Sequence, residues 1–361
     1  MKFIDEYRNV ELGKKLIARI HQRSTQPARL MEFCGGHTTA ILRHGIRQLI
    51  PQNIDMLSGP GCPVCVTANA DLDKAIASTH LPNTIITTFG DMMKVPGSHS
   101  SLQQAKAEGA DIHVVYSTQD ALQIAQDNPQ SSVIFIGIGF ETTAPTIAAS
   151  ILEAERRGIK NFYIFSFLKL CPPVIKAILN LGEIKLNGII GPGHVSTIIG
   201  SLPYEFIPRE YGIGCVISGF EPLDILLCID KLVEQIEGEQ PQVEIAYRRS
   251  VKPEGNRQAL DLMNEVFGIG EANWRGMGTI PASGLKLKRK YQRFNAEQIF
   301  SIDPGPPREP KGCICGEILR GIKMPTECKL FRRICTPEHP VGPCMVSSEG
   351  ACAAYYQYGA N

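Results

Sequence analysis

The sequence predicts an α/β protein with two Rossmann-like α/β lobes, built on mainly parallel sheets, and a cysteine-rich C-terminal segment. Three observations predict this. Short apolar, β-branched runs alternate with segments of helical period through the first two thirds of the chain. The runs form two groups, one before and one after about residue 155. Six of the 12 cysteines lie between positions 313 and 352.

Apolar runs of strand length define the predicted strands, at residues 84–88, 112–116, 133–138, 162–167, 188–190 and 215–218. Apolar residues at three- and four-residue spacing predict helices between them, at residues 40–50, 72–78, 102–107, 146–157 and 173–180. We therefore divide the chain into a first lobe at 1–155, a second lobe at 156–295 and a C-terminal segment at 296–361. The proline-rich stretch 303–310 predicts an extended linker into that segment.

Charge and hydropathy exclude two classes of protein. The chain has 361 residues, with 37 Lys and Arg against 36 Asp and Glu. Nucleic-acid binding depends on clustered basic residues, which this balance does not supply. No run of about 18 apolar residues predicts a membrane helix, and acids occupy the N-terminal positions where a secretory signal is apolar. We expect a cytoplasmic protein, where cysteines serve as metal ligands or redox thiols more often than as structural disulfides.

The first motif that could carry a chemical function is Cys-Gly-Gly-His at positions 34–37, just before the predicted helix 40–50. Gly35 and Gly36 allow a ligand to approach the backbone, and a helix N-terminus stabilises a thiolate at Cys34. His37 is a candidate second ligand or proton donor. A buried cysteine in a glycine turn is the structural alternative.

The second motif is Cys62-Pro-Val-Cys65, preceded by Gly-Pro-Gly. Two sulfurs at this spacing can cycle between dithiol and disulfide or bind a soft metal. The flanking glycines and proline predict an exposed loop, so two packed core cysteines are the less favoured interpretation. A zinc knuckle requires a second such pair, which is absent nearby, although Cys34 could join the first.

Glycine-bounded loops follow three predicted strands, beginning at Gly137, Gly191 and Gly219. Ligands bind at the carboxyl ends of strands in open α/β sheets, so we expect these loops to form part of a binding site. Their polar residues Glu141 and His194 are candidate acid/base groups, with helix capping or loop hydrogen bonding as alternatives.

Two further features belong to the same predicted edge. Asp91 closes another predicted strand and is a candidate for the same cleft, or a solvated turn acid. A dinucleotide-binding loop at Gly137-Ile-Gly139 lacks its third glycine, since Thr142 occupies that position. Nucleotide chemistry is therefore the weakest of the interpretations.

The C-terminal segment carries the densest group of cysteines, and an iron-sulfur cluster fits their number and irregular spacing better than structural zinc. A [4Fe-4S] cluster needs four thiolates, which leaves two for a redox pair. The spacing does not choose among the six. We favour Cys315, Cys328, Cys335 and Cys344 as ligands and hold Cys313 and Cys352 in reserve.

Five motifs occur together and in order along the chain. They are Cys34-Gly-Gly-His-Thr, Gly59-Pro-Gly-Cys-Pro-Val-Cys65, Gly139-Phe-Glu-Thr-Thr143, Gly191-Pro-Gly-His-Val-Ser196 and Cys344-Met-Val-Ser-Ser-Glu-Gly-Ala-Cys352. In this combination the chain resembles the HypD family of [NiFe]-hydrogenase maturation factors. The resemblance spans nearly the whole sequence.

The resemblance implies a scaffold on which the Fe(CN)2CO unit of the hydrogenase is assembled, and the hydrogenase large subunit is then served indirectly. The implied partners are the small chaperone HypC and the cyanide donor HypE. By the same resemblance Cys34 binds the iron together with HypC, Cys62 and Cys65 form a redox-active pair, and the tail holds a [4Fe-4S] cluster. Glu141 and His194 then shape the iron cleft.

We expect the sulfurs of Cys34, Cys62 and Cys65 to meet in one solvent-reachable hollow between the lobes. The cluster and the cysteine pair would then form an electron relay to the iron. The rival function is a free-standing iron-sulfur thiol-disulfide oxidoreductase, which needs the pair but not Cys34. A dinucleotide-dependent enzyme on two α/β lobes is the third possibility.

Overall fold

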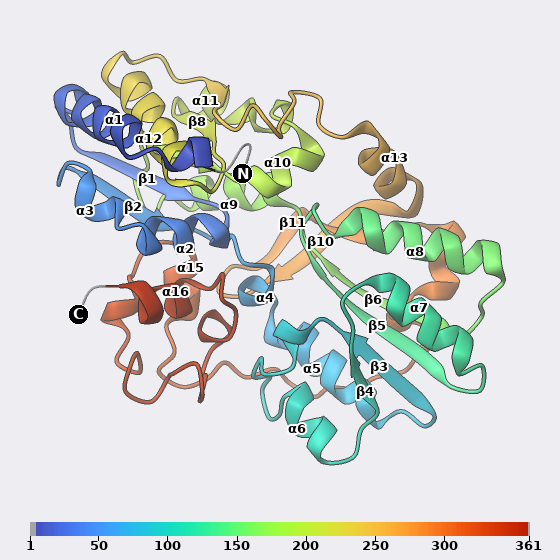
Figure 1. Cartoon of the computed structure of the whole chain (residues 1–361). Coiled ribbons are helices and arrows are strands. Elements are labelled where there is room, and N and C mark those ends of the chain that lie inside the picture. The colour runs from blue at the N-terminus through green and yellow to red at the C-terminus, as the bar shows by residue number, and fades with distance from the viewer. Residues whose placement is uncertain (1–4, 360–361) are drawn as a thin grey trace.

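Two parallel sheets and one antiparallel hairpin form the framework of the chain in a computed structural model that describes residues 5–359 (Figure 1). The first sheet has the order β2-β1-β7-β8-β9, with β1 Ala28–Glu32, β2 Ile54–Ser58, β7 Gly188–Gly191, β8 Gly214–Ile217 and β9 Val243–Ile245. The second has the order β4-β3-β5-β6, with β3 Thr84–Thr88, β4 Ile112–Val114, β5 Ser132–Gly139 and β6 Phe162–Leu168. The hairpin pairs β10 Phe267–Trp274 with β11 Gly278–Leu287. The predicted α/β class is confirmed.

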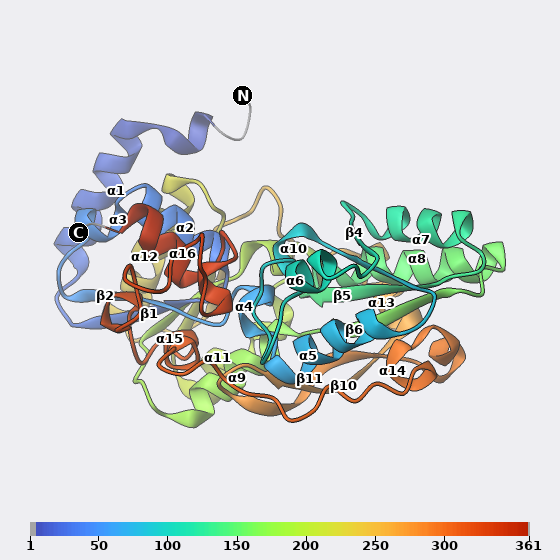
Figure 2. The same cartoon turned by 90° about the horizontal axis from the view of Figure 1, so that it is seen from below.

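Helices connect and cover these strands (Figure 2). In the first half of the chain they are α1 Val10–Arg23, α2 Gly35–Arg43, α3 Ile46–Leu49, α4 Pro63–Val66, α5 Asn69–Ala77, α6 Leu102–Ala107, α7 Thr118–Asp127 and α8 Ala144–Arg157. Then follow α9 Cys171–Leu181, α10 Gly193–Ile199, α11 Phe206–Tyr211, α12 Pro222–Glu237, α13 Arg257–Val266, α14 Ala296–Ile299, α15 Cys315–Leu319 and α16 Ala351–Tyr358. Short 3-10 turns include η1 Asp5–Arg8, η3 Gly90–Met92 and η7 Pro343–Met345.

The six predicted strands and the helices between them are found within a few residues of their predicted ends. The predicted helix 40–50 is two helices, because Gly45 adopts a left-handed backbone with φ of +63° that ends α2 and starts α3. The stretch 303–310 has no helix or strand and is mostly exposed, as expected of a linker.

The strands do not divide between the sheets at residue 155, as the predicted lobes 1–155 and 156–295 require. Strands β1 and β2 pair with β7 in the first sheet, while β6 completes the second sheet beside β5. Burial explains the long-range pairing. Four of the five residues of β1 are buried, so its backbone polar groups need a strand on each edge, which β2 and β7 provide. Residues 1–4 and 360–361 of the predicted ranges lie outside the described part of the chain.

The core is continuous between the sheets. Successive residues of β5 alternate, with Phe135 packing towards α7 and α8 and Ile136 packing into a cluster shared with the first sheet and the tail. That shared cluster contains Ile189 of the first sheet and Cys344 of the tail. Helix α4 lies near the centre of the molecule, where the two sheets and the tail approach one another (Figures 1 and 2).

None of the helices within residues 5–359 combines the length and the apolar character that crossing a membrane requires.

Candidate functional site

The carboxyl ends of the first sheet deliver four of the sequence motifs to one edge. The loops after β1, β2, β7 and β8 carry Cys34, Cys62, His194 and Phe220 in turn. These strands are all parallel, so their carboxyl ends point the same way. The predicted placement of the Gly191 and Gly219 loops at this edge is confirmed, whereas the loop that begins at Gly137 belongs to β5 of the second sheet.

Cys34 is the N-cap of α2 and is held from behind by a buried glutamate. The backbone N–H of Cys34 donates to Glu32 Oε2 at 2.9 Å, and the hydroxyl of Thr38 donates to the other oxygen of this carboxylate. Burial raises the pKa of Cys34 above its ordinary value, and the carboxylates of Glu349 and Glu32 raise it further. The backbone N–H groups of α2 act in the opposite direction, as predicted, but burial outweighs them. A cation bound at the sulfur would favour the thiolate again.

An aromatic stack orders the residues beside Cys34. His194 Nδ1 lies 4.0 Å from the sulfur of Cys34. The ring of Phe220 stacks on His194 at a centroid distance of 3.9 Å and on His37 at 4.6 Å, so it lies between two imidazoles. Packing of this kind fixes the ring of His194 relative to the thiol. Burial lowers the pKa of His194, which favours the neutral ring that a metal requires.

His37 has a different environment from His194. It is fully buried, and its Nε2 lies 3.0 Å from the carbonyl oxygen of Gly219 and 3.2 Å from that of Ser218. A neutral ring donating from Nε2 satisfies this geometry. Burial lowers the pKa of His37 to about 4, in agreement with that state. The ring therefore ties α2 to the loop after β8, and its Nδ1 has no partner among the described residues.

Cys62 and Cys65 form a disulfide, with Cα atoms 5.2 Å apart. The predicted exposed loop is wrong, because both cysteines are buried. The reason is close packing with the loop of Cys34. A Cβ atom on Gly61 would lie 2.3 Å from the backbone nitrogen of Cys34, so only glycine fits there. The two cysteine loops thus pack on each other, but the expected solvent-reachable hollow shared by the three sulfurs is wrong, because all three residues are buried.

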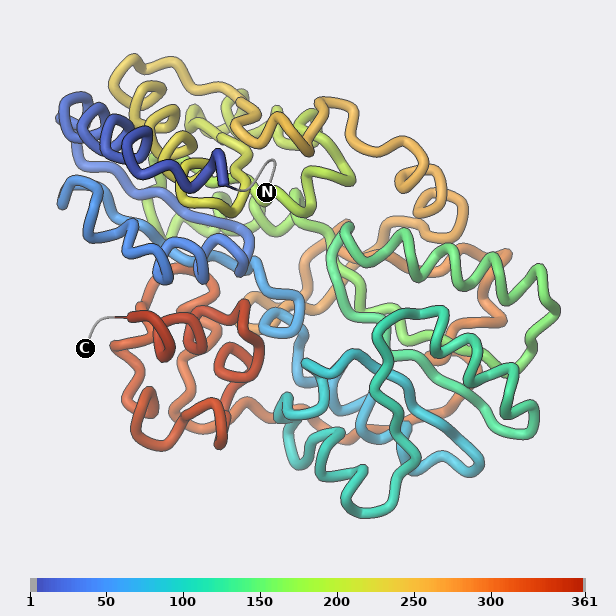
Figure 3. Tube along the Cα trace, viewed as in Figure 1, coloured from blue at the N-terminus to red at the C-terminus, as the bar shows by residue number. Residues whose placement is uncertain are grey.

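The two glycines after Cys34 also permit close approach, but by other parts of the protein. A Cβ atom on Gly35 would lie 2.2 Å from the carbonyl oxygen of Glu349, and one on Gly36 would lie 2.9 Å from the ring of Phe220. Thr39 donates to the carbonyl oxygen of Ser348 at 3.0 Å. The tail is therefore packed directly on the N-terminus of α2. In Figure 3 the red C-terminal segment of the Cα trace lies beside the blue segment that contains α2.

An open hollow of about 340 Å³ adjoins this cluster. Its lining includes Gly36 and His194 from the motifs, and it is completed by Arg8, Thr39, Ala40, Arg43, His44, Phe220, Glu221, Ser348 and Glu349. Cys34 is 6% exposed and does not line the hollow itself, whereas Gly36, two residues further along the chain, does. A metal centre on Cys34 would thus be reached from this side.

The other predicted acid/base residues do not line the hollow. Glu141 is buried, and its Oε1 accepts the backbone N–H of Cys171 at 2.9 Å. Its Oε2 has no partner among the described residues, and burial raises the pKa of Glu141 to about 7. Asp91 is exposed in η3. Burial is the main cause that raises the pKa of Glu349, and the charge of Asp91 raises it further. The turn that follows β3 therefore lies near the tail.

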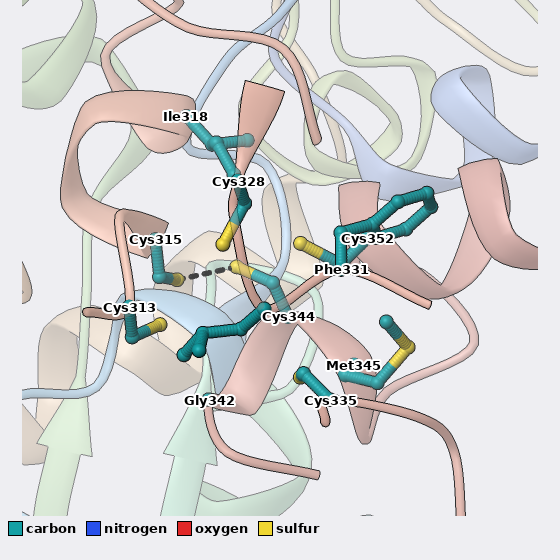
Figure 4. Close-up of a pocket in the computed structure, with 11 residues that line it drawn as sticks. Cys313, Cys315, Ile318, Cys328, Phe331, Cys335, Gly342, Cys344, Met345 and Cys352 are labelled. Carbon is teal, nitrogen blue, oxygen red and sulfur yellow. Dashed lines mark hydrogen bonds between the residues drawn. The ribbon is translucent and has the colours of Figure 1, made fainter. Parts of the chain in front are cut away.

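The tail cysteines lie together in a second site, a pocket with mostly apolar walls (Figure 4). All six cysteines line this pocket, together with Ile318, Leu330, Phe331, Gly342 and Met345. The sulfurs of Cys315 and Cys344 are 2.6 Å apart, and the backbone N–H of Val341 donates to the sulfur of Cys335 at 3.3 Å. The predicted convergence of the six tail thiols is found.

The donor set of this pocket fits an iron-sulfur cluster. Only thiols among its lining residues are strong metal ligands, and the remaining walls are apolar. Backbone N–H donation to sulfur and exclusion of water are features that tune such clusters. Within residues 5–359, no three His, Cys, Asp or Glu side chains are grouped for a single metal ion. Each thiolate of a cluster binds its own iron, so a cluster does not require that grouping.

The disulfide and the tail pocket are in contact. The disulfide sulfur of Cys65 lies 3.9 Å from the carbonyl oxygen of Pro343, whose neighbour Cys344 lines the pocket. Cys34, the disulfide and the tail thiols therefore form a continuous series of packed segments.

Comparison with known proteins agrees with this arrangement. The model of the family HypD, described as "Hydrogenase formation hypA family", matches residues 11–359. The chain belongs to the HypD family. Hydrogenase maturation factor HypD2 of Bradyrhizobium diazoefficiens is 47% identical, with 99% of this chain and 97% of that protein covered. The hydrogenase expression/formation protein HupD of Azotobacter chroococcum is 48% identical, and hydrogenase maturation factor HypD of Cupriavidus necator is 47% identical, with the same shares covered.

Within this HypD family member, several site residues escaped sequence reasoning. Glu32, Phe220 and Glu349 contact the Cys34 loop from three separate parts of the chain. Glu32 sits two residues before Cys34, and a buried acid next to a cysteine motif was a detectable signal. Phe220 and Glu349 lie within segments that the sequence analysis named, but only the tertiary fold brings them against the Cys34 loop.

Proposed function

We propose that this HypD-family protein is the scaffold on which iron is held while the Fe(CN)2CO unit of a [NiFe]-hydrogenase is assembled. The observation that carries the proposal is the position of Cys34, 4.0 Å from His194, which lines an open hollow. A thiolate suits low-spin iron carrying cyanide and CO, because both are soft partners. In this proposal Cys34 binds the iron, which is the cargo of the protein.

The proposed partners are those that the resemblance to the HypD family implies. A HypC-type chaperone would enter the hollow and complete the ligand set of the iron, and a HypE-type protein would deliver the cyanide. The rim offers charges of both signs for docking, since Arg8 pairs with Glu221 at 2.9 Å and Arg43 lies nearby. The hydrogenase large subunit would receive the finished unit indirectly, and we place these events in the cytoplasm.

A redox role is proposed for the two remaining thiol groups. A [4Fe-4S] cluster, held by four of the six tail thiols, would exchange single electrons. Reduction of the Cys62–Cys65 disulfide takes up two electrons and two protons and breaks one S–S bond. Because the pair touches both the Cys34 loop and the segment before Cys344, it is suited to store electrons close to the iron.

His194 and Glu141 have different parts in this proposal. His194 faces the sulfur of Cys34 and would donate a hydrogen bond to a ligand of the iron or exchange a proton with it. Glu141 supports the site from the second sheet through the backbone N–H of Cys171.

The test is infrared and Mössbauer spectroscopy on protein isolated anaerobically with its partners. The scaffold predicts bands of cyanide and CO on the protein, and about five irons per chain with a cluster of four. The second candidate, a free-standing thiol-disulfide oxidoreductase, is favoured by the contact between Cys65 and Pro343. It predicts about four irons and no diatomic bands.

A further inference from the structure

The turn between β10 and β11 carries a buried arginine that the proposed function does not use. Arg275 is 2% exposed. Its Nε donates to the carbonyl oxygen of Thr67 at 3.1 Å, and its Nη2 donates to Asn69 Oδ1 at 2.6 Å. Its Nη1 donates to Glu309 Oε2 at 2.9 Å. One side chain therefore joins the turn to two other segments.

The first of these segments follows the disulfide directly. Val66 and Thr67 come immediately after Cys65, and Thr67 forms a β-bridge with Trp274. The backbone N–H of Arg275 donates to the carbonyl oxygen of Val66 at 2.9 Å. Main-chain and side-chain bonds from one residue thus fix the chain on the C-terminal side of the Cys62–Cys65 pair.

The other side of the turn contacts the tail. A Cβ atom on Gly276 would lie 2.4 Å from the Cα atom of Gly316, and Gly276 has a φ of +71°, so glycine is required twice over. Gly316 follows Cys315, which lines the tail pocket. Arg320 also donates to the carbonyl oxygen of Gly276. The turn therefore packs between the segment that follows the disulfide, at Val66 and Thr67, and the segment of the tail pocket at Gly316.

The charge of Arg275 is only partly neutralised. Two of its three side-chain acceptors are neutral oxygens, and the third, Glu309, is 63% exposed on its side chain. Water screens an exposed carboxylate, so it compensates a buried guanidinium incompletely. A buried positive charge of this kind favours a thiolate on nearby sulfur, and a thiolate can form only in the reduced pair, not in the neutral disulfide.

We propose that Arg275 is a positioning residue that sets the redox equilibrium of the Cys62–Cys65 pair. It holds the segment that follows the disulfide, and its charge favours the reduced pair by stabilising the thiolate that reduction can form. This inference rests on the proposed function in that it assumes the pair to be redox-active.

The test is a redox titration of the full-length, cluster-loaded protein in dithiothreitol buffers under anaerobic conditions. The two thiols of dithiothreitol become its cyclic disulfide and release two electrons and two protons, while the Cys62–Cys65 bond takes up the two electrons and breaks; where one sulfur stays a thiolate, one proton binds the other sulfur and one passes to the buffer. Alkylation followed by mass spectrometry reports the reduced fraction. For Arg275→Met we expect the equilibrium constant for reduction to fall about tenfold, or about 30 mV for this two-electron couple. Arg275→Lys keeps the charge and should show a smaller fall.

The variant Glu309→Gln provides an independent test of the effect of the Arg275 charge. This side chain is largely exposed, so the variant should fold, and removal of its negative charge leaves Arg275 less neutralised. We expect reduction to become about twofold to threefold more favourable, opposite in sign to Arg275→Met. Arg320→Met is the matched control, because Arg320 contacts the same turn without touching the disulfide segment, and its constant should equal that of wild type.

The outcomes separate this inference from the proposed function. Equal constants in wild type, Arg275→Met and Glu309→Gln, with unchanged cluster absorbance, would overturn the role of Arg275. A pair that stays oxidised in every protein would overturn it as well. If the constants shift as expected while wild type assembles iron regardless of the redox state of the pair, the inference stands and the relay to the iron fails.

Discussion

The sulfur of Cys65 lies 3.9 Å from the carbonyl oxygen of Pro343. This contact joins two parts of the chain that are 278 residues apart in sequence. It places the disulfide against the turn η7, which also carries Cys344 of the thiol pocket. On its other side the disulfide loop packs on the backbone of Cys34. The pair is therefore the structural link between the two candidate metal sites.

Replacing both cysteines of the pair should stop assembly of the iron unit without removing the tail cluster. In Cys62→Ser/Cys65→Ser we expect the cyanide and CO bands to fall at least about tenfold, because no store of electrons remains beside Cys34. Infrared spectroscopy measures the bands, and visible absorbance measures the cluster.

Cys228→Ser is the matched control for that experiment. Cys228 is also fully buried, but its sulfur donates to the carbonyl oxygen of Val216 within the first sheet, and a serine hydroxyl can donate in the same way. Its bands should match those of wild type. Unimpaired cyanation in the double variant would remove the pair from the proposed function.

The tail pocket gives a second prediction. Single Cys→Ser changes at the six tail positions should divide into two groups, four that abolish the visible absorbance of the cluster and two that retain most of it. We expect Cys344 in the first group, since it is 1% exposed and central in the pocket. Met345→Leu, at the wall of the same pocket, should keep the absorbance. Full absorbance in all six variants would contradict a cluster at this site.

The sequence predicted individual elements better than their assembly. Strands β3, β5 and β6 are strongly apolar and β-branched or aromatic, and their predicted positions were confirmed. Strands β1 and β2 carry Arg29 and Asp55 within five residues each, so their periodicity was too weak to detect. The pairing of β1 with β7 crosses about 160 residues of sequence and depends on burial that only the tertiary structure provides.

For the site, the motifs were informative and their surroundings were not. The sequence identified Cys34, His194 and the tail thiols as candidates, and the structure brings the first two together. It indicated an exposed loop for Cys62 and Cys65, because glycine and proline usually mark surface turns. Here the glycines serve close packing instead. The hairpin that carries Arg275 was not predicted, since glycines interrupt the alternation of its strands.

Glu141 gives a prediction about pH. Burial raises its pKa from 4.5 to about 7. Between these values the folded protein keeps a proton that the unfolded chain has released, so this group makes the free energy of unfolding fall as pH rises. Below about pH 4 the contribution of Glu141 to the free energy of unfolding is fully present, and above about pH 7 it is fully lost.

Glu141→Gln removes this contribution while its Oε1 can still accept the N–H of Cys171. We expect the free energy of unfolding to decline less between pH 5 and 8 in the variant, by at most roughly 3 kcal/mol. Denaturant titrations at several pH values measure it. Glu32, whose pKa is also raised to about 7, contributes the same slope to both proteins and cancels in the comparison. Parallel pH profiles would show that Glu141 is not buried as a neutral acid.

The last prediction concerns the stack beside Cys34. In His194→Ala we expect the infrared bands of bound cyanide and CO to weaken several-fold or shift, because the imidazole 4.0 Å from the sulfur is lost. Phe220→Leu keeps an apolar side chain but removes both stacks, so the ring of His194 is no longer held. We expect an intermediate effect on the bands and a loss of about 1–2 kcal/mol in the free energy of unfolding.

His44→Ala separates this effect from a general change in the hollow. His44 lines the same hollow, but it caps the far end of α2 and takes no part in the stack. Its bands should be those of wild type. Bands of wild-type strength and position in His194→Ala would mean that the imidazole only packs on Phe220, and the ligands of the iron would then have to be sought among Cys34 and the partner protein alone.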